Sequence, residues 1–259
     1  MNRIAAALTG RQSLALLAYV TVGYPTPALT PALVKAIADA GADLIELGIP
    51  FSDPLADGPT IQASSQAALR QGVTVAGALE VIRQARALTP APMLVMSYLN
   101  PILAYGIARF CRDAVDAGVD GLIVPDLPPG EAGELRAAAA DSGLGLVFFV
   151  SPTSSPERMR AACDAATAFV YCIAVTGTTG ARDRLDEALL PLLDRVRACT
   201  TLPIVVGFGI SRPEHLQALQ GHADGAIVAS ALLDAIARAP EDPVGAARRF
   251  VIDLRQPGV

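Results

Sequence analysis

The stretch ADLIELGIPFSDPLADGPT (residues 42–60) joins a buried-looking apolar run to a segment with three prolines and two aspartates. Its first part, DLIELGI (43–49), is almost continuously apolar rather than strictly alternating, which is typical of a parallel strand covered on both faces. Along such a strand Leu44, Glu46 and Gly48 point to one side, because successive side chains alternate between the faces. The fold determines whether that side is the interior.

Seven further runs of this type occur, at residues 14–22, 93–98, 121–126, 145–150, 168–174, 202–208 and 225–230. Amphipathic stretches lie between them. Thr26, Thr30 and Ser155 each precede a proline, as an N-cap precedes proline at the first helical position, and Gly41 stands where a helix would end. The sequence therefore predicts eight strands that alternate with helices.

This alternation predicts an α/β fold, a single (β/α)8 TIM barrel over residues 1–259. The long connection after the second strand predicts a loop with an added helix. An open doubly wound sheet is the alternative, and TVGYPTP (21–27) disfavours it because it stands where a G-x-G-x-x-G would follow the first strand.

Composition narrows the class of protein. Of the 259 residues 52% are hydrophobic and 17% charged, which predicts a sizeable core. The apolar runs are too short to span a membrane and the N-terminus does not resemble a signal peptide, so a cytoplasmic protein is expected. With 20 basic and 25 acidic residues and no basic run, a nucleic-acid partner is not expected. Four cysteines without a C-x-x-C pair indicate reduced core residues.

In a barrel of this kind the active site lies where the strands end. If the face of Glu46 is the interior, the second strand delivers a carboxylate to that end, where burial raises its pKa towards neutrality. A structural glutamate that pairs with a buried arginine or caps a loop is the alternative. Asp57 follows in a loop held by prolines, and two carboxylates at one barrel mouth allow acid and base roles to be divided. Asp53 is interpreted as a turn residue or a partner contact.

Glycines with adjacent hydroxyls follow the last three strands, at TGTTG (176–180), FGIS (208–211) and Ala229-Ser230. Backbone N–H groups in such turns converge on an anion, and barrels often bind phosphate after strands seven and eight. A phosphorylated small-molecule substrate is therefore expected.

Two absences narrow the reaction. Lys35 is the only lysine and falls on a predicted helix, which argues against Schiff-base chemistry. His215 and His222 are the only histidines, and both are predicted at the surface of a helix, which argues against a metal site. What remains is proton transfer by carboxylates on a substrate that accepts electrons itself.

The segment ELGIPFSDPLADGPTIQ (46–62) resembles the signature of the tryptophan synthase alpha chain family. The resemblance covers nearly the whole chain, through AYVTVGYP (18–25), SYLNPI (97–102), VPDLP (124–128), TGTTGAR (176–182) and FGIS. It implies cleavage of indole-3-glycerol phosphate to indole and glyceraldehyde 3-phosphate, by a retro-aldol reaction that needs no cofactor in this chain.

The resemblance also implies roles for single residues. Glu46 would move protons to ring C3 and from the glyceryl hydroxyl, and Asp57 would hold the indole N–H. Tyr171 would lie near them, Thr179 would contact the aspartate, and the indole slot would be lined by Tyr19, Ile61, Tyr98, Ile123, Phe149 and Phe208. The phosphate would be bound by Gly180, Gly209, Ile210, Ala229 and Ser230.

The implied partner is a pyridoxal-phosphate-containing beta subunit in an alpha2-beta2 heterotetramer, contacted by Pro50, Asp53, Asn100 and Pro128. A mobile loop at 176–185 would close over the substrate. Two residues depart from the family pattern: Val175 stands where many members have arginine, and Ala229 where glycine commonly precedes the phosphate serine. These put loop closure and phosphate affinity in question.

Three other functions are compatible with the sequence. A free-standing indole-3-glycerol-phosphate lyase would carry the same motifs without a partner. A mainly regulatory binding subunit would have lost catalysis, which the intact Glu46 and Asp57 argue against. Another phosphate-binding barrel, such as a sugar-phosphate isomerase, would leave the acidic, proline-rich loop unexplained.

Overall fold

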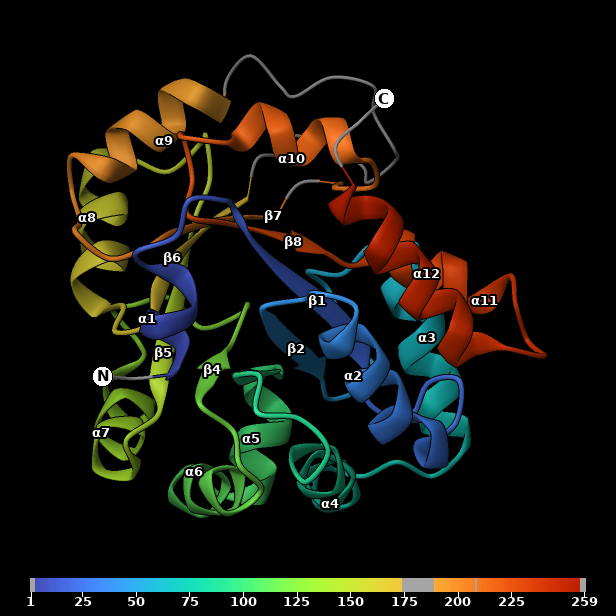
Figure 1. The fold of residues 1–259 in the computed structure, drawn as a ribbon. Helices are drawn as coiled ribbons and strands as arrows, with labels where there is room; N and C mark the ends of the chain where they lie inside the picture. The colour runs from blue at the N-terminus through green and yellow to red at the C-terminus, as the bar shows by residue number, and fades with distance from the viewer. Residues whose placement is uncertain (1–2, 174–188, 208, 257–259) are drawn as a thin grey trace.

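A computed structural model describes residues 3–173, 189–207 and 209–256 of the chain. Eight parallel strands pair in sequence order, and β8 pairs with β1 to close the barrel (Figure 1). The strands are β1 (Ala15–Thr21), β2 (Leu44–Gly48), β3 (Met93–Met96), β4 (Gly121–Ile123), β5 (Gly145–Val150), β6 (Phe169–Ile173), β7 (Ile204–Gly207) and β8 (Gly225–Val228). The predicted barrel is confirmed, and the open sheet is wrong.

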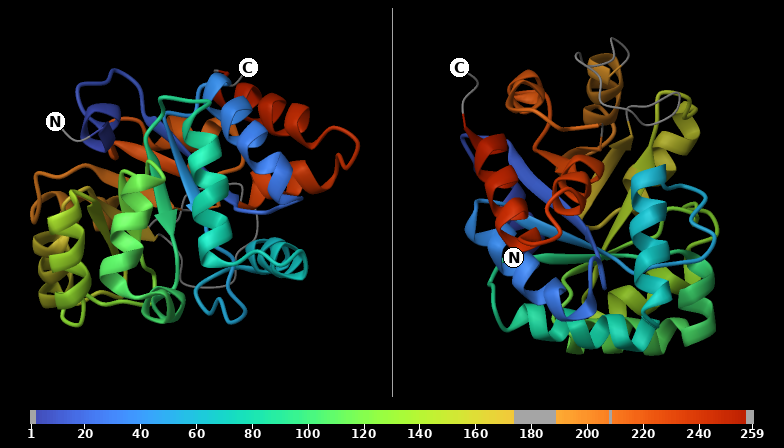
Figure 2. Two further views of the ribbon diagram at one scale, coloured as in Figure 1. Left: turned by 90° about the horizontal axis from the view of Figure 1, so that it is seen from below. Right: turned by 90° about the vertical axis from the view of Figure 1, so that its right-hand side faces the viewer.

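Helices surround the strands on the outside (Figure 2). Those described are α1 (Arg3–Leu8), η1 (Pro27–Leu29), α2 (Thr30–Asp39), α3 (Pro59–Arg70), α4 (Val75–Arg86), α5 (Leu99–Tyr105), α6 (Ile107–Asp116), α7 (Gly133–Ser142), α8 (Pro156–Ala165), α9 (Leu189–Arg197), α10 (Pro213–Leu219), α11 (Ser230–Ala237) and α12 (Pro243–Arg255). The added helix predicted after the second strand is α3. No helix in the described ranges is long and apolar enough to cross a membrane.

The helix-start predictions were partly correct. Ser155 caps α8, because its hydroxyl accepts a hydrogen bond from the Arg158 N–H at 3.3 Å. Thr30 is not an N-cap: it is the first residue of α2, and its hydroxyl accepts from the Gly23 N–H at 3.0 Å. Thr26 precedes η1 without a side-chain cap bond. Gly41, with φ of 109°, follows the end of α2 as predicted.

One set of strand side chains fills the barrel interior. It includes Leu17, Leu44, Leu94, Ile123, Val147, Phe169, Val205 and Ile227, together with Ile4 and Leu8 of α1, which close the barrel at the N-terminal ends of the strands. Ile45 and Leu47 belong instead to the layer between strands and helices. The face of β2 that carries Leu44 and Glu46 is therefore the interior face.

At the N-terminal end of the barrel, the side chain of a residue just before each even-numbered strand accepts a hydrogen bond. The donor is a backbone N–H near the start of the preceding strand. The pairs are Asp43 with the Leu16 N–H (2.8 Å), Asp120 with Met93 (2.9 Å), Thr167 with Leu146 (2.8 Å) and Asp224 with Ile204 (2.7 Å). Each of the three aspartates also forms salt bridges with arginines. Asp43 pairs with Arg11 and Arg255, Asp120 with Arg3 and Arg86, and Asp224 with Arg197. We call these four contacts the strand clamps. They hold the N-terminal end of the barrel, opposite to the C-terminal strand ends where the active site is expected.

Candidate active site

Glu46 lies on the interior face near the end of β2, beside Tyr19 of β1 and Leu94 of β3 in the strand register. It is 2% exposed, and its Oε2 is buried without a hydrogen-bond partner in the described part of the chain. No arginine or lysine among those residues pairs with it, so the alternative of a structural ion pair is not supported. Burial, and then the charge of Asp57, raise the pKa of Glu46 to about 8.

Asp57 lies at the end of the loop between β2 and α3, directly before Gly58, the N-cap of α3. The loop is tied to the barrel by Tyr98, whose hydroxyl accepts a hydrogen bond from the Ala56 N–H at 3.0 Å. Burial raises the pKa of Asp57 to about 6, and a hydrogen bond from the Tyr98 side chain opposes the rise. The loop thus delivers a second carboxyl group whose charge reaches Glu46.

The two carboxyl groups differ in protonation near neutral pH. With pKa values of about 8 for Glu46 and about 6 for Asp57, the pair carries one proton at pH 7, predominantly on the more deeply buried Glu46. A neutral carboxyl beside an ionised one is the arrangement that separates a proton donor from a charge-stabilising group.

Aromatic and aliphatic residues surround this pair. Phe149 of β5 and Tyr171 of β6 lie with ring centroids 4.7 Å apart. Burial first, and then the charges of Glu46 and Asp57, raise the pKa of Tyr171, so its hydroxyl lies within electrostatic reach of both. Ile61, Ile123, Phe149 and Tyr171 pack in the interior cluster with Tyr19. The structure thus brings these predicted slot residues together.

Sequence reasoning missed two neighbours of the slot. Met96 ends β3, where it pairs with Gly48 and Ile123, and packs against the interior cluster. Its parity with Leu94 in the run at 93–98 was the signal that could have revealed it. Phe51 stacks on Tyr98 at 5.4 Å between ring centroids and carries no periodic signal, since it lies in a loop.

The predicted phosphate residues that the structure describes follow β7 and β8, which are neighbours in the barrel. Gly209 is exposed with φ of 49°, Ile210 is buried, and Ser230 is the first residue of α11. Ala229 precedes it with φ of −128°, outside the left-handed region that favours glycine. The alanine therefore fits this turn. Val175, Thr179, Gly180 and Phe208 lie outside the described residues.

The prediction that His215 lies at the surface is wrong. His215 is 7% exposed, because α10 turns it and Leu219 towards the barrel, and its Nδ1 accepts a hydrogen bond from the Ser211 N–H at 3.3 Å. His222 is exposed as predicted. Within the described ranges, no group of three or more histidine, cysteine or acidic residues is placed to hold a metal ion.

The predicted partner-contact residues follow β2, β3 and β4: Pro50, Asp53 and Pro128 lie in loops, and Asn100 lies in the first turn of α5. Asp53, Asn100 and Pro128 are exposed, whereas Pro50 is buried. Leu55, at the tip of the loop between β2 and α3, is 93% exposed. An apolar side chain held out in this way lies beside Asp53 on the same loop.

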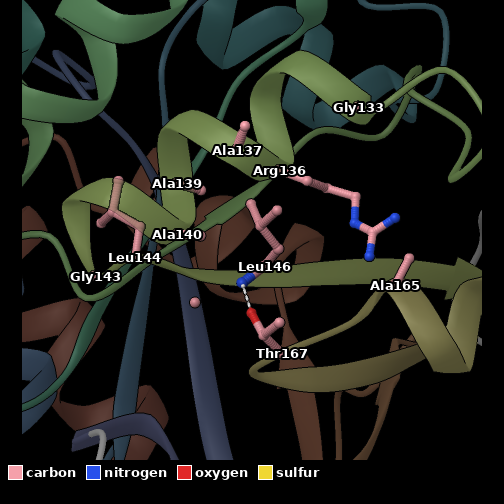
Figure 3. A pocket seen from close by; sticks show the side chains of 11 residues that line it. Gly133, Arg136, Ala137, Ala139, Ala140, Gly143, Leu144, Leu146, Ala165 and Thr167 are labelled. Atoms are coloured by element: carbon pink, nitrogen blue, oxygen red, sulfur yellow. Dashed lines mark hydrogen bonds between the residues drawn. The ribbon is translucent and has the colours of Figure 1, made fainter.

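A groove of about 500 Å³ lies elsewhere, on the outside of the barrel (Figure 3). It is lined by residues of α7, by Leu146 and by Ala165 and Thr167. Thr167 and Leu146 form the strand clamp between β5 and β6. The groove is therefore at the opposite end of the barrel from the carboxyl pair.

Comparisons with known proteins agree with this geometry. A family model described as tryptophan synthase alpha chain matches residues 5–256. The tryptophan synthase alpha chain of Roseiflexus castenholzii is 49% identical over 98% of this chain and 100% of its own length. The corresponding chain of Chloroflexus aggregans is 48% identical over 98% of this chain and 97% of its own.

Solved structures give the same result. A chain of Mycobacterium tuberculosis tryptophan synthase is similar with a TM-score of 0.90 and 36% identity, covering 98% of this chain and 99% of that chain. The alpha chain from Legionella pneumophila has a TM-score of 0.89 and 36% identity, covering 99% and 97%. By both its sequence and its structure, this protein belongs to the tryptophan synthase alpha chain family.

Proposed function

We propose that this chain is an alpha subunit of tryptophan synthase that cleaves indole-3-glycerol phosphate to indole and glyceraldehyde 3-phosphate. The observation that carries the proposal is the placement of Glu46, buried on the interior face of β2, at the barrel mouth with the loop that carries Asp57. The raised pKa values of the two groups, about 8 and about 6, favour a protonated Glu46 and an ionised Asp57 at neutral pH. A retro-aldol cleavage of this substrate needs a proton donor at ring C3 and a negative charge near the ring nitrogen.

The reaction follows from those two states. Glu46 donates its proton to indole C3, and the carboxylate of Asp57 accepts a hydrogen bond from the N–H as the ring becomes positively charged. The bond between C3 and the glyceryl carbon then breaks, and its electrons return to the ring. The Glu46 carboxylate takes the proton of the glyceryl hydroxyl as the aldehyde forms, so Glu46 ends the cycle protonated.

The surrounding residues bind the rest of the substrate. Phe149, Tyr171 and Ile123 form apolar walls for the indole ring, as their shared cluster suggests. Gly209, Ser230 and the start of α11 supply N–H groups for the phosphate, with Gly180 completing the site. The chain needs no cofactor of its own, because the protonated ring accepts the electrons.

The exposed loop after β2 is suited to contact with a partner subunit. Leu55 and Asp53 present an apolar and a charged contact beside the active site, which suits the docking of a beta subunit in an alpha2-beta2 assembly that receives the indole. The pyridoxal phosphate of the second reaction would be bound by that subunit. We expect the assembly in the cytoplasm.

An assay of indole formation from indole-3-glycerol phosphate, with and without a beta subunit, tests the proposal. Indole formation that the beta subunit strongly increases is expected. High turnover of the isolated chain without further activation would favour a free-standing lyase, and binding of substrate without any cleavage would favour a regulatory subunit. Glu46→Gln should abolish turnover while the chain still binds substrate, and near-normal turnover of that variant would contradict the role of Glu46.

A further inference from the structure

Two hydroxyl groups meet where α3 packs over the end of β1, on the interior face of that strand. Thr21, the last residue of β1, is 0% exposed, and Ser64 on α3 is 2% exposed. Their oxygens, Thr21 Oγ1 and Ser64 Oγ, are 2.6 Å apart, which is a short and well-formed hydrogen bond. Both hydroxyl groups of this pair are buried.

The pair belongs to a longer chain of contacts. Ser64 Oγ donates to the Ile61 carbonyl at 2.8 Å, one turn earlier on α3. On the other side, Thr21 Oγ1 lies 3.4 Å from the hydroxyl of Tyr19, which stands beside Glu46 in the strand register. The contacts therefore run from the neighbour of Glu46 to the first turn of α3.

The first turn of α3 holds Asp57 in place. Asp57 directly precedes Gly58, the N-cap residue, which has no side chain with which to fix the start of the helix. The loop before it is tied to Tyr98 through the Ala56 N–H. The start of the helix after it is tied to β1 through Ser64 and Thr21. The chain is therefore fixed on both sides of Asp57, by Tyr98 before it and by the Thr21–Ser64 contact after it.

The register of the strands connects this tie to Glu46. Thr21 pairs with Gly48, two residues beyond Glu46 on the same face of β2. The contacts therefore begin beside the strand that carries Glu46 and end at the start of the helix that Asp57 precedes. A displacement of α3 relative to β1 changes the separation of the two carboxyl groups.

We propose that Thr21 and Ser64 are positioning residues whose paired hydroxyls hold the start of α3, and with it Asp57, at a fixed place relative to Glu46. The inference rests on the proposed function, because it assigns the pair a role through the two carboxyl groups. Neither hydroxyl is assigned a contact with the substrate.

Substitutions at Thr21 separate shape from hydrogen bonding. Thr21→Val keeps the volume and removes the hydroxyl, whereas Thr21→Ser keeps the hydroxyl and removes a methyl group. Ser65→Ala removes the neighbouring buried serine of the same helix and serves as the matched control. Each variant is assayed with the beta subunit for kcat, KM and the pH dependence of kcat/KM, and its unfolding in urea is measured.

We expect Thr21→Val to lower kcat by roughly tenfold with little change in KM, because misplaced catalytic groups cost rate more than binding. The alkaline limb of kcat/KM should move to lower pH, since an Asp57 that is held less closely raises the pKa of Glu46 less. Thr21→Ser and Ser65→Ala should keep the kcat and pH profile of the unsubstituted protein. Ser64→Ala should reproduce Thr21→Val, and the double variant should cost no more than either single one.

The proposal is overturned if folded Thr21→Val retains the original kcat and pH profile, or if Thr21→Ser is impaired equally. If Thr21→Val does not fold, Ser64→Ala compared with Ser65→Ala decides in the same way. Equal effects of those two serine variants would assign Ser64 a packing role only. A failure of the proposed function is distinct, since the unsubstituted protein would then form no indole.

Discussion

The hydroxyl of Tyr19 on β1 lies directly against the α-carbon of Gly48 on β2, so a Cβ at residue 48 would meet the tyrosine oxygen at 2.0 Å. The same relationship occurs between β6 and β7, where a Cβ at Gly207 would lie 2.4 Å from the Tyr171 hydroxyl. In each case the glycine stands on the neighbouring strand, two residues beyond the register partner of the tyrosine. The two glycines thus make room for tyrosine rings beside the carboxyl pair.

Gly48→Ala should therefore destabilise the fold and lower indole formation. Overpacking a tightly filled interior typically costs about 1–3 kcal/mol, and here it also displaces the ring beside Glu46. Unfolding in urea and the rate of indole formation measure the two effects. Adding Tyr19→Leu should recover stability, because it removes the ring that the new methyl group meets.

Gly130→Ala is the control for that substitution, since no atom lies within 4 Å of a Cβ there and its φ is not positive. It should leave stability within about 0.5 kcal/mol, as surface substitutions usually do. A Gly48→Ala variant as stable and active as Gly130→Ala would show that the interior can accommodate the methyl group, and the packing argument would fail.

The pH dependence of kcat/KM should be bell-shaped with limbs near pH 6 and pH 8. Activity should fall below about pH 6, because protonated Asp57 no longer stabilises the positively charged ring. It should fall above about pH 8, because ionised Glu46 no longer donates a proton to C3. Initial rates at low substrate concentration between pH 5 and pH 9.5 provide the test. A flat profile across pH 8 would show that Glu46 does not begin the cycle protonated.

Stability should respond to the same buried glutamate. The pKa of Glu46 is raised from 4.5 in the unfolded chain to about 8 in the fold, so the folded state retains the proton over this interval. The contribution of Glu46 to the free energy of unfolding is fully present below pH 4.5 and is lost as the pH rises through 8. The loss corresponds to an upper limit on the order of 4–5 kcal/mol.

Glu46→Gln should remove this dependence, because the amide stays neutral. Relative to the unsubstituted protein, the variant should become progressively more stable between pH 5 and pH 8.5, as measured by urea unfolding at each pH. Glu241→Gln, at an exposed position, should show no such trend. If Glu46→Gln follows the same pH dependence as the unsubstituted protein, the ionisation of Glu46 does not limit stability.

The sequence was sufficient to predict the barrel and the placement of Glu46 and Asp57 near its mouth, because strand runs and loop prolines are local signals. It could not choose the face of β2, since both faces of the strand are buried and only closure of the barrel distinguishes them. Thr30 and His215 were misjudged because each forms its contact through the tertiary turn around it: Thr30 with the Gly23 N–H, and His215 with the Ser211 N–H.

The strand clamps were also absent from the sequence-based predictions. The aspartates at 43 and 120 each bind a backbone N–H that lies 27 residues earlier in the chain, so no short-range pattern reveals the contact. The Thr21–Ser64 contact joins residues 43 apart for the same reason. Such hydrogen bonds depend on which strands and helices become neighbours, and therefore follow from the closed fold.

Asp43→Ala should be among the most destabilising single substitutions at the N-terminal end of the barrel. It removes the acceptor of the Leu16 N–H at 2.8 Å and leaves Arg11 and Arg255 without their shared carboxylate. Loss of such a partly buried network should cost about 2–4 kcal/mol, measured by urea unfolding. Thr167→Val removes the one clamp without an arginine and should cost about 1–2 kcal/mol. Asp39→Ala breaks only the exposed pair with Lys35 and should cost less than about 1 kcal/mol. An Asp43→Ala variant that loses no more stability than Asp39→Ala would contradict the view that the clamps hold this end of the barrel.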